Sequence, residues 1–310
     1  MVPAQPSITR GTAAFVPPGD GVVLTIGNFD GVHRGHRALV SRTREVAAAL
    51  GSPSALLTFD PAPRDVIRPD NGVPRIQVLP DKLATLGATG IDHVVVEPFT
   101  LATAGQPPEA FATEILRDRL GVRALVLGYD FRFGRKRAGD AELLRRVLDV
   151  PVEEVSALVV DGAPVSSSRI REAVARGDLP TATHLLGRPH ALCGTVQHGD
   201  ARGRALGFPT ANVRPDTPLT PPYGVYAVRV EVDGRWVDGV ANWGVRPMWE
   251  LAEPLLEVHL LDFDGDLYDR RLAVSMVQHL RGEARFDGLE ALKAAIDADV
   301  AAARAALAAT

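Results

Sequence analysis

The periodicity of apolar residues changes once along this chain of 310 residues, near Leu186–His190. Before that point, short apolar runs such as Val22–Ile26 and Ala55–Phe59 alternate with helical patterns such as His36–Leu50. Strand and helix in this rhythm predict a parallel sheet with helices on both faces. In such sheets, ligands bind beyond the carboxyl ends of the strands. We therefore expect a doubly wound α/β domain with its site at that edge.

After that point, strand patterns dominate almost to the end of the chain. The alternating segment Val225–Val232 is followed by Asp233-Gly234, a hairpin signal. Two more strands are predicted at Leu256–Phe263 and Leu272–Leu280, and a helix begins near Leu289. The second half is thus expected to form a small antiparallel β-barrel or sandwich with a terminal helix.

Length and composition fit two well-packed domains. At roughly 100–200 residues per domain the chain has room for two, and we place them at residues 1–184 and 185–310. Hydrophobic residues make up 46% of the chain and charged residues 23%, so a sizeable core can form. The formal net charge of −4 argues against general binding to nucleic acid or to acidic membranes.

Three features predict a cytoplasmic location. The one cysteine, Cys193, excludes an internal disulfide and a Cys-rich zinc site, and it fits a reducing compartment. The first residues lack the apolar core of a signal peptide, and no uncharged apolar stretch approaches the roughly 18 residues of a spanning helix. For the oligomeric state we expect a monomer or a transient oligomer.

A glycine-rich segment with several potential cations follows the first predicted strand. It consists of Gly27, Asn28, Phe29, Asp30, Gly31, Val32, His33, Arg34, Gly35 and His36, followed by Arg37. The glycines let the backbone approach a ligand closely. The cations stand at a helix start, where the macrodipole disfavours positive charge, and a bound phosphate would remove that conflict. A plain surface loop remains an alternative, as does a His-x-x-His metal pair that lacks a third ligand nearby.

A second helix start repeats this arrangement. Ser166, Ser167 and Ser168 are candidate N-cap residues before a helix that runs to about Arg176, and Arg171 places a charge near its beginning. Taken alone, this is equally an ordinary capped helix with exposed arginines. Two such helix starts at the strand ends of one sheet favour a shared polyphosphate.

The stretch Phe131–Asp140 interleaves basic and aromatic residues after the strand Ala124–Leu127. Such interleaving can signal RNA binding, but the stretch is short and the chain is acidic overall. A local pocket for a phosphate and a planar ring fits better. The chain has neither a Walker A motif nor Gly-x-Gly-x-x-Gly, which argues against a P-loop enzyme and an ordinary dinucleotide oxidoreductase.

The predicted barrel has its own candidate site. Its glycine-rich loop Gly199–Asn212 has backbone N–H groups that could cradle phosphates, and Thr210 and Asn212 offer oxygens suited to Mg²⁺. A carboxylate on the inward face of a barrel is costly unless it is paired or used, which makes Glu257 a candidate general base for a substrate hydroxyl. The alternatives are a flexible turn before an edge strand, and a surface carboxylate on an outward face.

Together, the two sites resemble the bifunctional prokaryotic riboflavin kinase/FAD synthetase family over nearly the whole chain. The motifs that carry the resemblance are Gly-Asn-Phe-Asp-Gly-Val-His-Arg-Gly-His (27–36), Ser-Ser-Ser-Arg-Ile-Arg (166–171), Leu-Gly-Phe-Pro-Thr-Ala-Asn (206–212) and Glu-Val-His-Leu-Leu-Asp-Phe-Asp-Gly-Asp-Leu-Tyr (257–268). The resemblance implies a Rossmann-like nucleotidylyltransferase domain followed by a riboflavin kinase-like barrel. It implies phosphorylation of riboflavin to FMN with ATP, then adenylylation of FMN to FAD with release of pyrophosphate. Riboflavin, FMN, FAD and ATP are the expected partners, and Mg²⁺ is the expected cofactor.

The resemblance also implies roles for individual residues. Glu257 would accept the proton of the riboflavin 5′-hydroxyl, and His33, His36 and Arg171 would stabilise charge on the transferring group in the adenylylation step. The residues expected to bind ATP and its phosphates are Gly27, Asn28, Phe29, Asp30, Gly31, Ser166, Ser167, Ser168, Gly199, Arg202, Gly203, Arg204, Gly207 and Pro209. The residues expected to contact the flavin are Asp60, Asp130, Phe131, Gly134, Asn242 and Arg281. The expected metal ligands are Thr210 and Asn212.

The chain departs from the family pattern at several positions. Ala62 stands where the family usually has a histidine that could donate to a phosphate. In the barrel, Met248 and Trp249 replace Thr-Phe, and Asp269 replaces a glycine. Two alternatives follow. One is a paralogue that keeps the riboflavin kinase activity and adenylylates weakly, and the other is a non-catalytic regulator that binds flavin or nucleotide.

Overall fold

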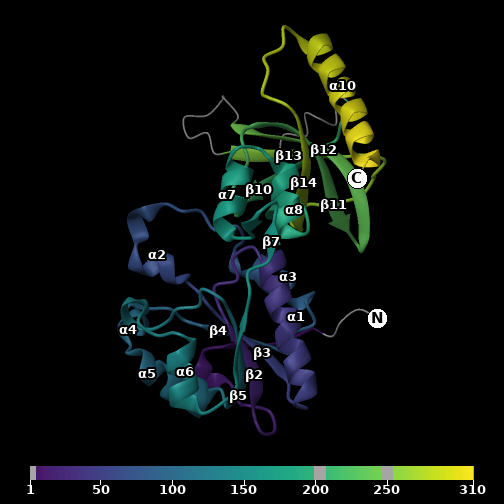
Figure 1. Ribbon diagram of the computed structural model, residues 1–310. Helices are drawn as coiled ribbons and strands as arrows, with labels where there is room; N and C mark the ends of the chain where they lie inside the picture. The colour runs from purple at the N-terminus through teal and green to yellow at the C-terminus, as the bar shows by residue number, and fades with distance from the viewer. Residues whose placement is uncertain (1–4, 199–206, 246–253, 310) are drawn as a thin grey trace. The chain divides into compact units, whose positions relative to one another are not determined.

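The computed structural model describes residues 5–198, 207–245 and 254–309. Within it the chain forms two compact units (Figure 1). The first consists of Met1–Val73 with Leu79–Ser166, and the second of Pro74–Val78 with Ser167–Thr310. Each unit has its own hydrophobic core.

A six-stranded parallel sheet in the order β1-β4-β3-β2-β5-β6 forms the centre of the first unit. The strands are β1 (Ser7–Arg10), β2 (Val22–Ile26), β3 (Ser54–Phe59), β4 (His93–Glu97), β5 (Val122–Gly128) and β6 (Val152–Val155), and a separate two-stranded ribbon joins β7 (Val159–Val160) to β8 (Ala163–Pro164). The chain passes from β2 to β3 on one side and later returns to β5 on the other side of β2. This reversal is where ligands bind in such sheets. The carboxyl ends of β3, β2 and β5 therefore lie side by side at one edge.

Helices cover both faces of this sheet, as the sequence pattern predicts. The helical segments are η1 (Thr12–Ala14), α1 (Arg34–Ala49), α2 (Pro63–Ile67), η2 (Pro69–Asn71), α3 (Leu79–Gly87), α4 (Leu101–Gly105), α5 (Pro108–Ala110), the π-helical η3 (Phe111–Arg119), η4 (Arg135–Arg137) and α6 (Ala141–Leu148). The alternation in β2 separates the two faces. Leu24 joins the core formed with η3 and α6, whereas Val23 joins the core formed with α1 and α3.

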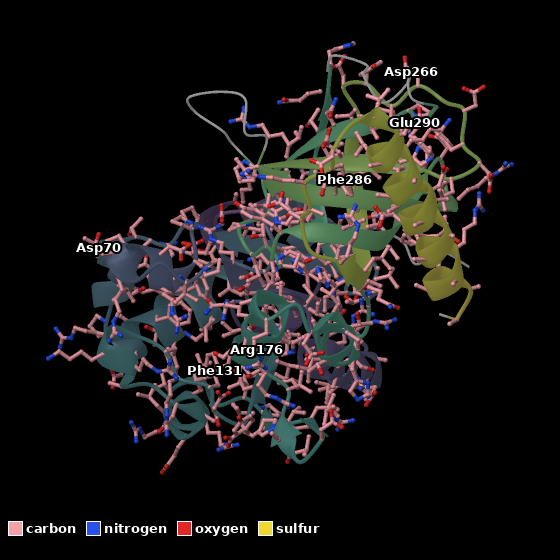
Figure 2. All side chains as sticks on the ribbon, turned by 90° about the horizontal axis from the view of Figure 1, so that it is seen from above. Asp70, Phe131, Arg176, Asp266, Phe286 and Glu290 are labelled. Carbon is pink, nitrogen blue, oxygen red and sulfur yellow. The ribbon has the colours of Figure 1, made fainter. Side chains whose placement is uncertain are left out.

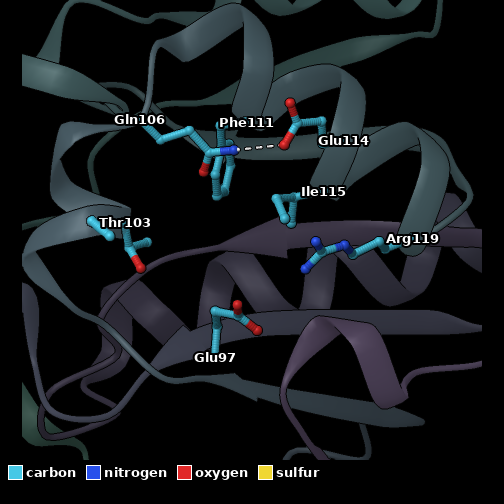
Figure 3. Close-up of a pocket in the computed structure, with 8 residues that line it drawn as sticks. Glu97, Thr103, Gln106, Phe111, Glu114, Ile115 and Arg119 are labelled. Carbon is cyan, nitrogen blue, oxygen red and sulfur yellow. Dashed lines mark hydrogen bonds between the residues drawn. The ribbon is translucent and has the colours of Figure 1, made fainter.

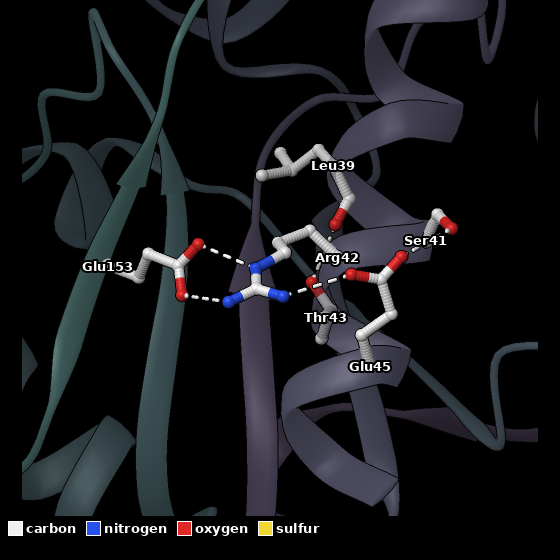
Figure 4. A network of polar contacts seen from close by, with 6 residues as sticks. All are labelled: Leu39, Ser41, Arg42, Thr43, Glu45 and Glu153. Carbon is white, nitrogen blue, oxygen red and sulfur yellow. Dashed lines mark hydrogen bonds and ion pairs between the residues drawn. The ribbon is translucent and has the colours of Figure 1, made fainter. Parts of the chain in front are cut away.

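A surface network holds α1 against β6 (Figure 4). Arg42 donates from Nε and Nη2 to the carboxylate of Glu153 at 2.7 and 3.0 Å, and from Nη1 to Glu45 at 3.0 Å. The hydrogen bond from Arg42 lowers the pKa of the Glu153 carboxyl below its usual range. Exposed pairs of this kind contribute less than about 1 kcal/mol. The network therefore serves more to orient α1 than to stabilise the fold. The first turn of α1 carries a candidate site.

The second unit contains a closed six-stranded barrel in the order β10-β13-β12-β11-β14-β9. The strands are β9 (His190–Gln197), β10 (Ala211–Pro215), β11 (Gly224–Val232), β12 (Arg235–Val245), β13 (Pro254–Leu260) and β14 (Arg271–Arg281). Tyr226 and Val228 belong to the face that fills the interior, as the alternation predicts. The predicted hairpin turn is also confirmed, because Asp233 and Gly234 have φ of 52° and 76°, as a type I′ turn requires.

Among the residues that the structure describes, three helices accompany the barrel. Helices α7 (Ser167–Ala175) and α8 (Leu179–Leu186) pack on each other, and α8 contacts β9 and β14. The terminal helix α10 (Leu289–Ala308) covers an outer face through Ala303 and Leu307, which pack on β11 and β12. Since α7 and α8 pack with the barrel, the compact unit begins before the predicted domain boundary at 184/185. The boundary itself, drawn between functional domains, stays a prediction.

Candidate functional sites

The segment between β2 and α1 has a strained backbone. Phe29 and Val32 have φ of 49° and 40°, in the left-handed region that a β-branched residue rarely adopts, and Gly31 has φ of 82°. Both strained side chains are fully buried, which holds the segment in this shape. Strain of this kind is common in loops that bind ligands. Asn28, directly before Phe29, is exposed. Asp30, directly after Phe29, is half-buried.

Two stacked histidines form the first turn of α1. His33 is the N-cap residue, and its Nδ1 accepts a hydrogen bond from the backbone N–H of His36 at 3.2 Å. The two rings stack with centroids 3.5 Å apart. Burial lowers the pKa of His36 well below its usual value, and the charges of His33 and Lys82 lower it further. The expectation that His36 is one of the cations of this helix start is therefore wrong at neutral pH, because its ring is desolvated.

The same turn has polar atoms that suit a ligand. Nδ1 of His36 and Nε of Arg37 are buried and make no hydrogen bond within the described part of the chain. Such atoms are costly in a folded protein unless they bind something. They lie at the positive end of the dipole of α1, where an anion is stabilised. The arrangement fits the phosphate site that the sequence predicts.

Lys82 is a buried residue of this edge that the sequence analysis missed. Its amine donates to the carbonyl of Asn28 at 3.3 Å, to Oγ1 of Thr58 at 3.1 Å and to the carbonyl of Phe59 at 3.4 Å. It therefore ties the end of β2 to the end of β3, behind the loop that begins at Gly27. In the sequence, Lys82 looks like any surface lysine of a helix, and only the fold shows that α3 turns it inward.

The residues predicted to contact flavin in the first domain follow β3 and β5. Asp60 is half-buried directly after β3, and Asp130 is exposed after β5. Phe131 stacks on Phe133 with centroids 5.6 Å apart. Gly134 has φ of 70°, and a Cβ there would lie 2.8 Å from Pro108, so only glycine fits. The sheet thus brings these residues to the edge that carries His33 and His36.

A cavity of about 330 Å³ opens beside η3 (Figure 3). Its lining residues are Glu97, Ala102, Thr103, Gln106, Phe111, Glu114, Ile115 and Arg119. Two contacts connect the cavity to the loop after β5. The ring of Phe111 lies 5.5 Å from that of Phe133, and the backbone N–H of Arg135 donates to the carbonyl of Gln106 at 2.9 Å.

The serine-rich helix start is divided between the two units. Val165 belongs to the first unit, and its carbonyl oxygen lies 3.7 Å from the position of a Cβ on Gly35, so Ser166 follows directly beside the start of α1. Ser167 and Ser168 are the first residues of α7, in the second unit. Arg171 is in the same helix, and its Nε donates to the carbonyl of Pro74 at 2.8 Å. The expected action of Arg171 together with His33 and His36 stays a prediction.

In the barrel, three predicted residues form one row across neighbouring strands. Asn212 on β10 pairs with Glu257 on β13, and Glu257 pairs on its other side with Asn242 on β12. Residues paired in this way point to the same face, with Cβ atoms about 4.5–5.5 Å apart. Asn212 is buried, whereas Glu257 and Asn242 are half-buried. Glu257, the predicted general base, thus adjoins Asn212, a predicted metal ligand, and Asn242, a predicted flavin contact.

This row lies on the outer face of the barrel. Leu256, Val258 and Leu260 fill the interior, so Glu257 between them points outward. The argument that rested on an inward carboxylate is therefore wrong, and the outward alternative holds. The strand also ends at Leu260 rather than at Phe263, because Asp262 has φ of 55° and turns the chain away.

The segment before β10 fits an oxygen-liganded cation. Thr210 is half-buried and directly precedes β10, two residues before Asn212. Hydroxyl, amide and carboxylate oxygens are the donors that Mg²⁺ takes, with phosphate oxygens and water completing its shell. No cluster of three His, Cys, Asp or Glu side chains is found in the described ranges, so any metal there needs such neutral donors. Gly207 and Pro209 are exposed, and Gly199, Arg202, Gly203, Arg204, Met248 and Trp249 lie outside the described residues.

Arg281, predicted to contact flavin, is bound to the terminal helix. Its Nε and Nη2 donate to the carboxylate of Asp299 on α10 at 2.8 and 2.7 Å. Its guanidinium carbon also lies 5.4 Å from the ring centroid of Phe286, which is labelled in Figure 2. These two contacts fasten α10 and the segment before it to the end of β14.

Two of the departures from the family pattern lie within the described residues. Asp269, where a glycine is usual, has φ of 59°, and its backbone N–H donates to the carbonyl of Val196 at 3.0 Å. Aspartate tolerates the left-handed region better than most residues, so the turn survives the replacement. Ala62 is the N-cap residue of α2, and its side chain cannot accept a capping hydrogen bond.

Comparisons with known proteins agree with both halves of the molecule. The family profile of FAD synthetase matches residues 18–169, and that of riboflavin kinase matches residues 186–307. A solved structure named macrolide-efflux protein, from Streptococcus pneumoniae, matches 97% of this chain and 99% of its own at a TM-score of 0.86 and 27% identity. Among the described helices, none is both long enough and apolar enough to cross a membrane.

Curated relatives match almost the whole chain. A bifunctional riboflavin kinase/FMN adenylyltransferase of Pseudomonas fluorescens is 46% identical over 96% of this chain and 97% of its own. Proteins with the same name from Escherichia coli K12 and Bacillus subtilis are 40% and 34% identical, over 93% and 89% of this chain and 93% and 90% of theirs. On these matches, the chain belongs to the family of bifunctional riboflavin kinase/FMN adenylyltransferases.

Proposed function

We infer that this chain catalyses two consecutive reactions. In the first, ATP phosphorylates riboflavin to FMN, and in the second, ATP adenylylates FMN to FAD with release of pyrophosphate. The observation that supports this most strongly is the presence of both family domains in one chain, each with its own core and its own set of matching motifs. The single-activity paralogue and the non-catalytic regulator are not favoured, since relatives named for both activities match the whole length.

In the kinase step, Glu257 is proposed to act as the general base. Its carboxylate takes the proton of the riboflavin 5′-hydroxyl while that oxygen attacks the γ-phosphorus of ATP. The bond from the γ-phosphorus to the bridging oxygen breaks, and ADP leaves. The position of Glu257 between Asn212 and Asn242 supports this role, because amide side chains can orient a carboxylate and a hydroxyl together.

Thr210 and Asn212 are the residues proposed to hold Mg²⁺. Bound with ATP, the ion would neutralise charge on the phosphates. Both side chains are neutral oxygen donors next to Glu257, which suits a cation that also takes phosphate oxygens.

In the adenylylation step, the start of α1 is proposed to bind the phosphates of ATP. An oxygen of the FMN phosphate attacks the α-phosphorus, and the bond to pyrophosphate breaks. The neutral ring of His36, the N–H groups of the first turn and the arginines beside them stabilise charge without a covalent intermediate. Phosphoryl and nucleotidyl transfers of this kind depend mainly on positioning and electrostatics.

We further propose that the cavity beside η3 receives the isoalloxazine ring of FMN. Phe111 lines it and contacts Phe133, and Gln106 binds the backbone of the loop that carries Phe131 and Gly134. Phe111 and Ile115 offer apolar surface for a planar ring, and the polar and charged side chains that line the rest of the cavity can bind its polar edge.

The remaining proposals concern the whole chain. A cytoplasmic location is supported by the cysteine content, because a chain with one cysteine, Cys193, forms no internal disulfide. The proposed functional domains are residues 1–184 and 185–310, and the proposed state is a monomer or a transient oligomer.

The two activities are tested by incubating the purified protein with ATP, Mg²⁺ and either riboflavin or FMN, and separating the flavins by chromatography. We expect FMN and then FAD from riboflavin, and FAD directly from FMN. If neither flavin is converted, the proposal is wrong. If FMN accumulates without FAD, only the kinase half holds.

A further inference from the structure

His259 binds the loop that precedes β10. Its Nδ1 lies 2.8 Å from the carbonyl oxygen of Pro209. A carbonyl oxygen only accepts hydrogen bonds, so Nδ1 carries a proton and donates it. The ring also meets Phe208 edge to face, with centroids 5.6 Å apart and an angle of 88°. One side chain therefore contacts two successive residues of this loop.

The hydrogen bond from His259 lies just beyond the last residue pair of the ladder between β10 and β13. β10 pairs with β13 through Ala211 opposite Val258 and Asn212 opposite Glu257. Continued by one residue, this register would place Thr210 opposite His259, but β10 begins only at Ala211. The imidazole thus extends the attachment of β10 to β13 past the last paired residues.

His259 also shares a face with Glu257. The two residues are separated by one position on β13, and side chains two apart point to the same side of a strand. Phe208 and Pro209, which His259 contacts, therefore lie along the face that carries the proposed general base. Thr210, the proposed metal ligand, is the residue directly after Pro209.

We propose that His259 is a positioning residue of the riboflavin kinase site. By holding the carbonyl of Pro209 and the ring of Phe208, it fixes Thr210 relative to Asn212 and Glu257, so that the nucleotide–metal complex meets the general base in a reactive geometry. Misplacement of a reacting group by about 1 Å can cost a hundredfold in rate. This inference rests on the proposed kinase function and adds to it a residue that touches no reacting atom.

Three substitutions at His259 separate the hydrogen bond from packing. In His259→Asn, the amide nitrogen stands close to the place of Nδ1 and can donate to the same carbonyl. In His259→Gln, the amide nitrogen is displaced by one bond, and His259→Leu keeps bulk without a donor. His279→Leu is the matched control, because His279 is an exposed histidine of β14 whose ring contacts that of Tyr226.

The experiment measures KM for ATP–Mg²⁺ and kcat of FMN formation, and in parallel the affinity for ADP–Mg²⁺ by calorimetry. We expect His259→Leu to raise KM and to weaken ADP–Mg²⁺ binding by about tenfold each, the effect of losing one hydrogen bond that holds a binding loop. His259→Asn should recover most of this loss, His259→Gln little, and His279→Leu should resemble the wild type. FAD formation from supplied FMN should be unchanged in all four.

The proposal is overturned if His259→Leu binds ADP–Mg²⁺ as the wild type does, or if His259→Asn is no better than His259→Leu. Thermal unfolding of each variant shows whether it is folded. If the wild type binds ADP–Mg²⁺ but makes no FMN, the proposed function fails, while the calorimetric comparison still decides the role of His259.

Discussion

Asn212 on β10 lies directly opposite Glu257 on β13, with a buried side chain beside a half-buried carboxylate. This pairing brings together two segments separated by more than forty positions in the sequence, each of which carries one of the family motifs. It also makes Glu257 sensitive to whatever charge stands at position 212.

A second carboxylate at position 212 should destabilise the barrel and weaken the kinase step. In Asn212→Asp, two carboxylates face each other across the ladder, and like charges directly opposite each other destabilise a sheet by up to about 1 kcal/mol. Urea unfolding should therefore show Asn212→Asp to be less stable than Asn212→Ala, which adds no charge. Both variants should lower kcat/KM of FMN formation and leave FAD formation from supplied FMN unchanged. Equal stability of the two variants would show that the side chains at 212 and 257 do not interact.

The Arg281–Asp299 pair should couple strongly in stability. The Asp299 side chain is 10% exposed and that of Arg281 is 31% exposed, so either residue alone leaves a poorly solvated charge. A double-mutant cycle with Arg281→Met and Asp299→Asn, followed by urea unfolding, should give a coupling of about 2 kcal/mol. The Arg304–Asp262 pair, which also fastens α10, is the control. Its side chains are 51% and 76% exposed, and its coupling should stay below about 1 kcal/mol. Equal couplings would contradict the role of burial.

The barrel should lose stability in mild acid through His190. This residue is 2% exposed, and burial lowers its pKa from 6.5 to about 4. The unfolded chain therefore takes up a proton at a pH where the folded barrel does not. The contribution of the neutral His190 ring to the free energy of unfolding is fully present above pH 6.5. It is lost as the pH falls toward 4, by about 3 kcal/mol in all.

Tryptophan fluorescence can follow this loss, because all three tryptophans lie in the second unit. Nε2 of His190 donates to the carbonyl of Leu219 at 2.9 Å, and a glutamine can reach the same acceptor without titrating. His190→Gln should flatten the dependence of unfolding free energy on pH in this range. A dependence as steep as that of the wild type would assign the effect to another group.

Filling the cavity beside η3 should impair only the adenylylation step. Ala102 lines the cavity and is exposed, so Ala102→Trp can occupy the space without disturbing the core. We expect KM for FMN to rise by about tenfold or more, with FMN formation from riboflavin unchanged. Leu101→Trp is the matched control, since Leu101 is 72% exposed on the same helix and does not line the cavity. An unaltered KM for FMN in Ala102→Trp would place the flavin elsewhere.

Much of the fold could be predicted because its pattern is local. The hairpin at Asp233-Gly234 follows from turn chemistry and from the alternation before it, and the helix starting at Arg34 follows from the motif after β2. What depends on burial could not be predicted. The lowered pKa of His36 and the inward position of Lys82 result from contacts made by distant segments.

The orientation of Glu257 shows the same limit. Alternation along β13 defines two faces, but it does not say which one is the interior. The neighbouring strands settle the matter, because Leu256 and Val258 join Tyr226 in the core. The row of Asn212, Glu257 and Asn242 likewise depends on strand order and register, which no single segment contains.

The central claim is that two separate sites act in sequence, and Glu257→Gln tests it most directly. Given riboflavin and ATP–Mg²⁺, this variant should form FMN at least about a hundredfold more slowly than the wild type, because the general base is lost. Given FMN, it should form FAD at the wild-type rate. Glu231→Gln, the same change at an exposed position on β11, should leave both rates unchanged. FMN formation at the wild-type rate in Glu257→Gln, or loss of FAD formation from supplied FMN, would contradict the account.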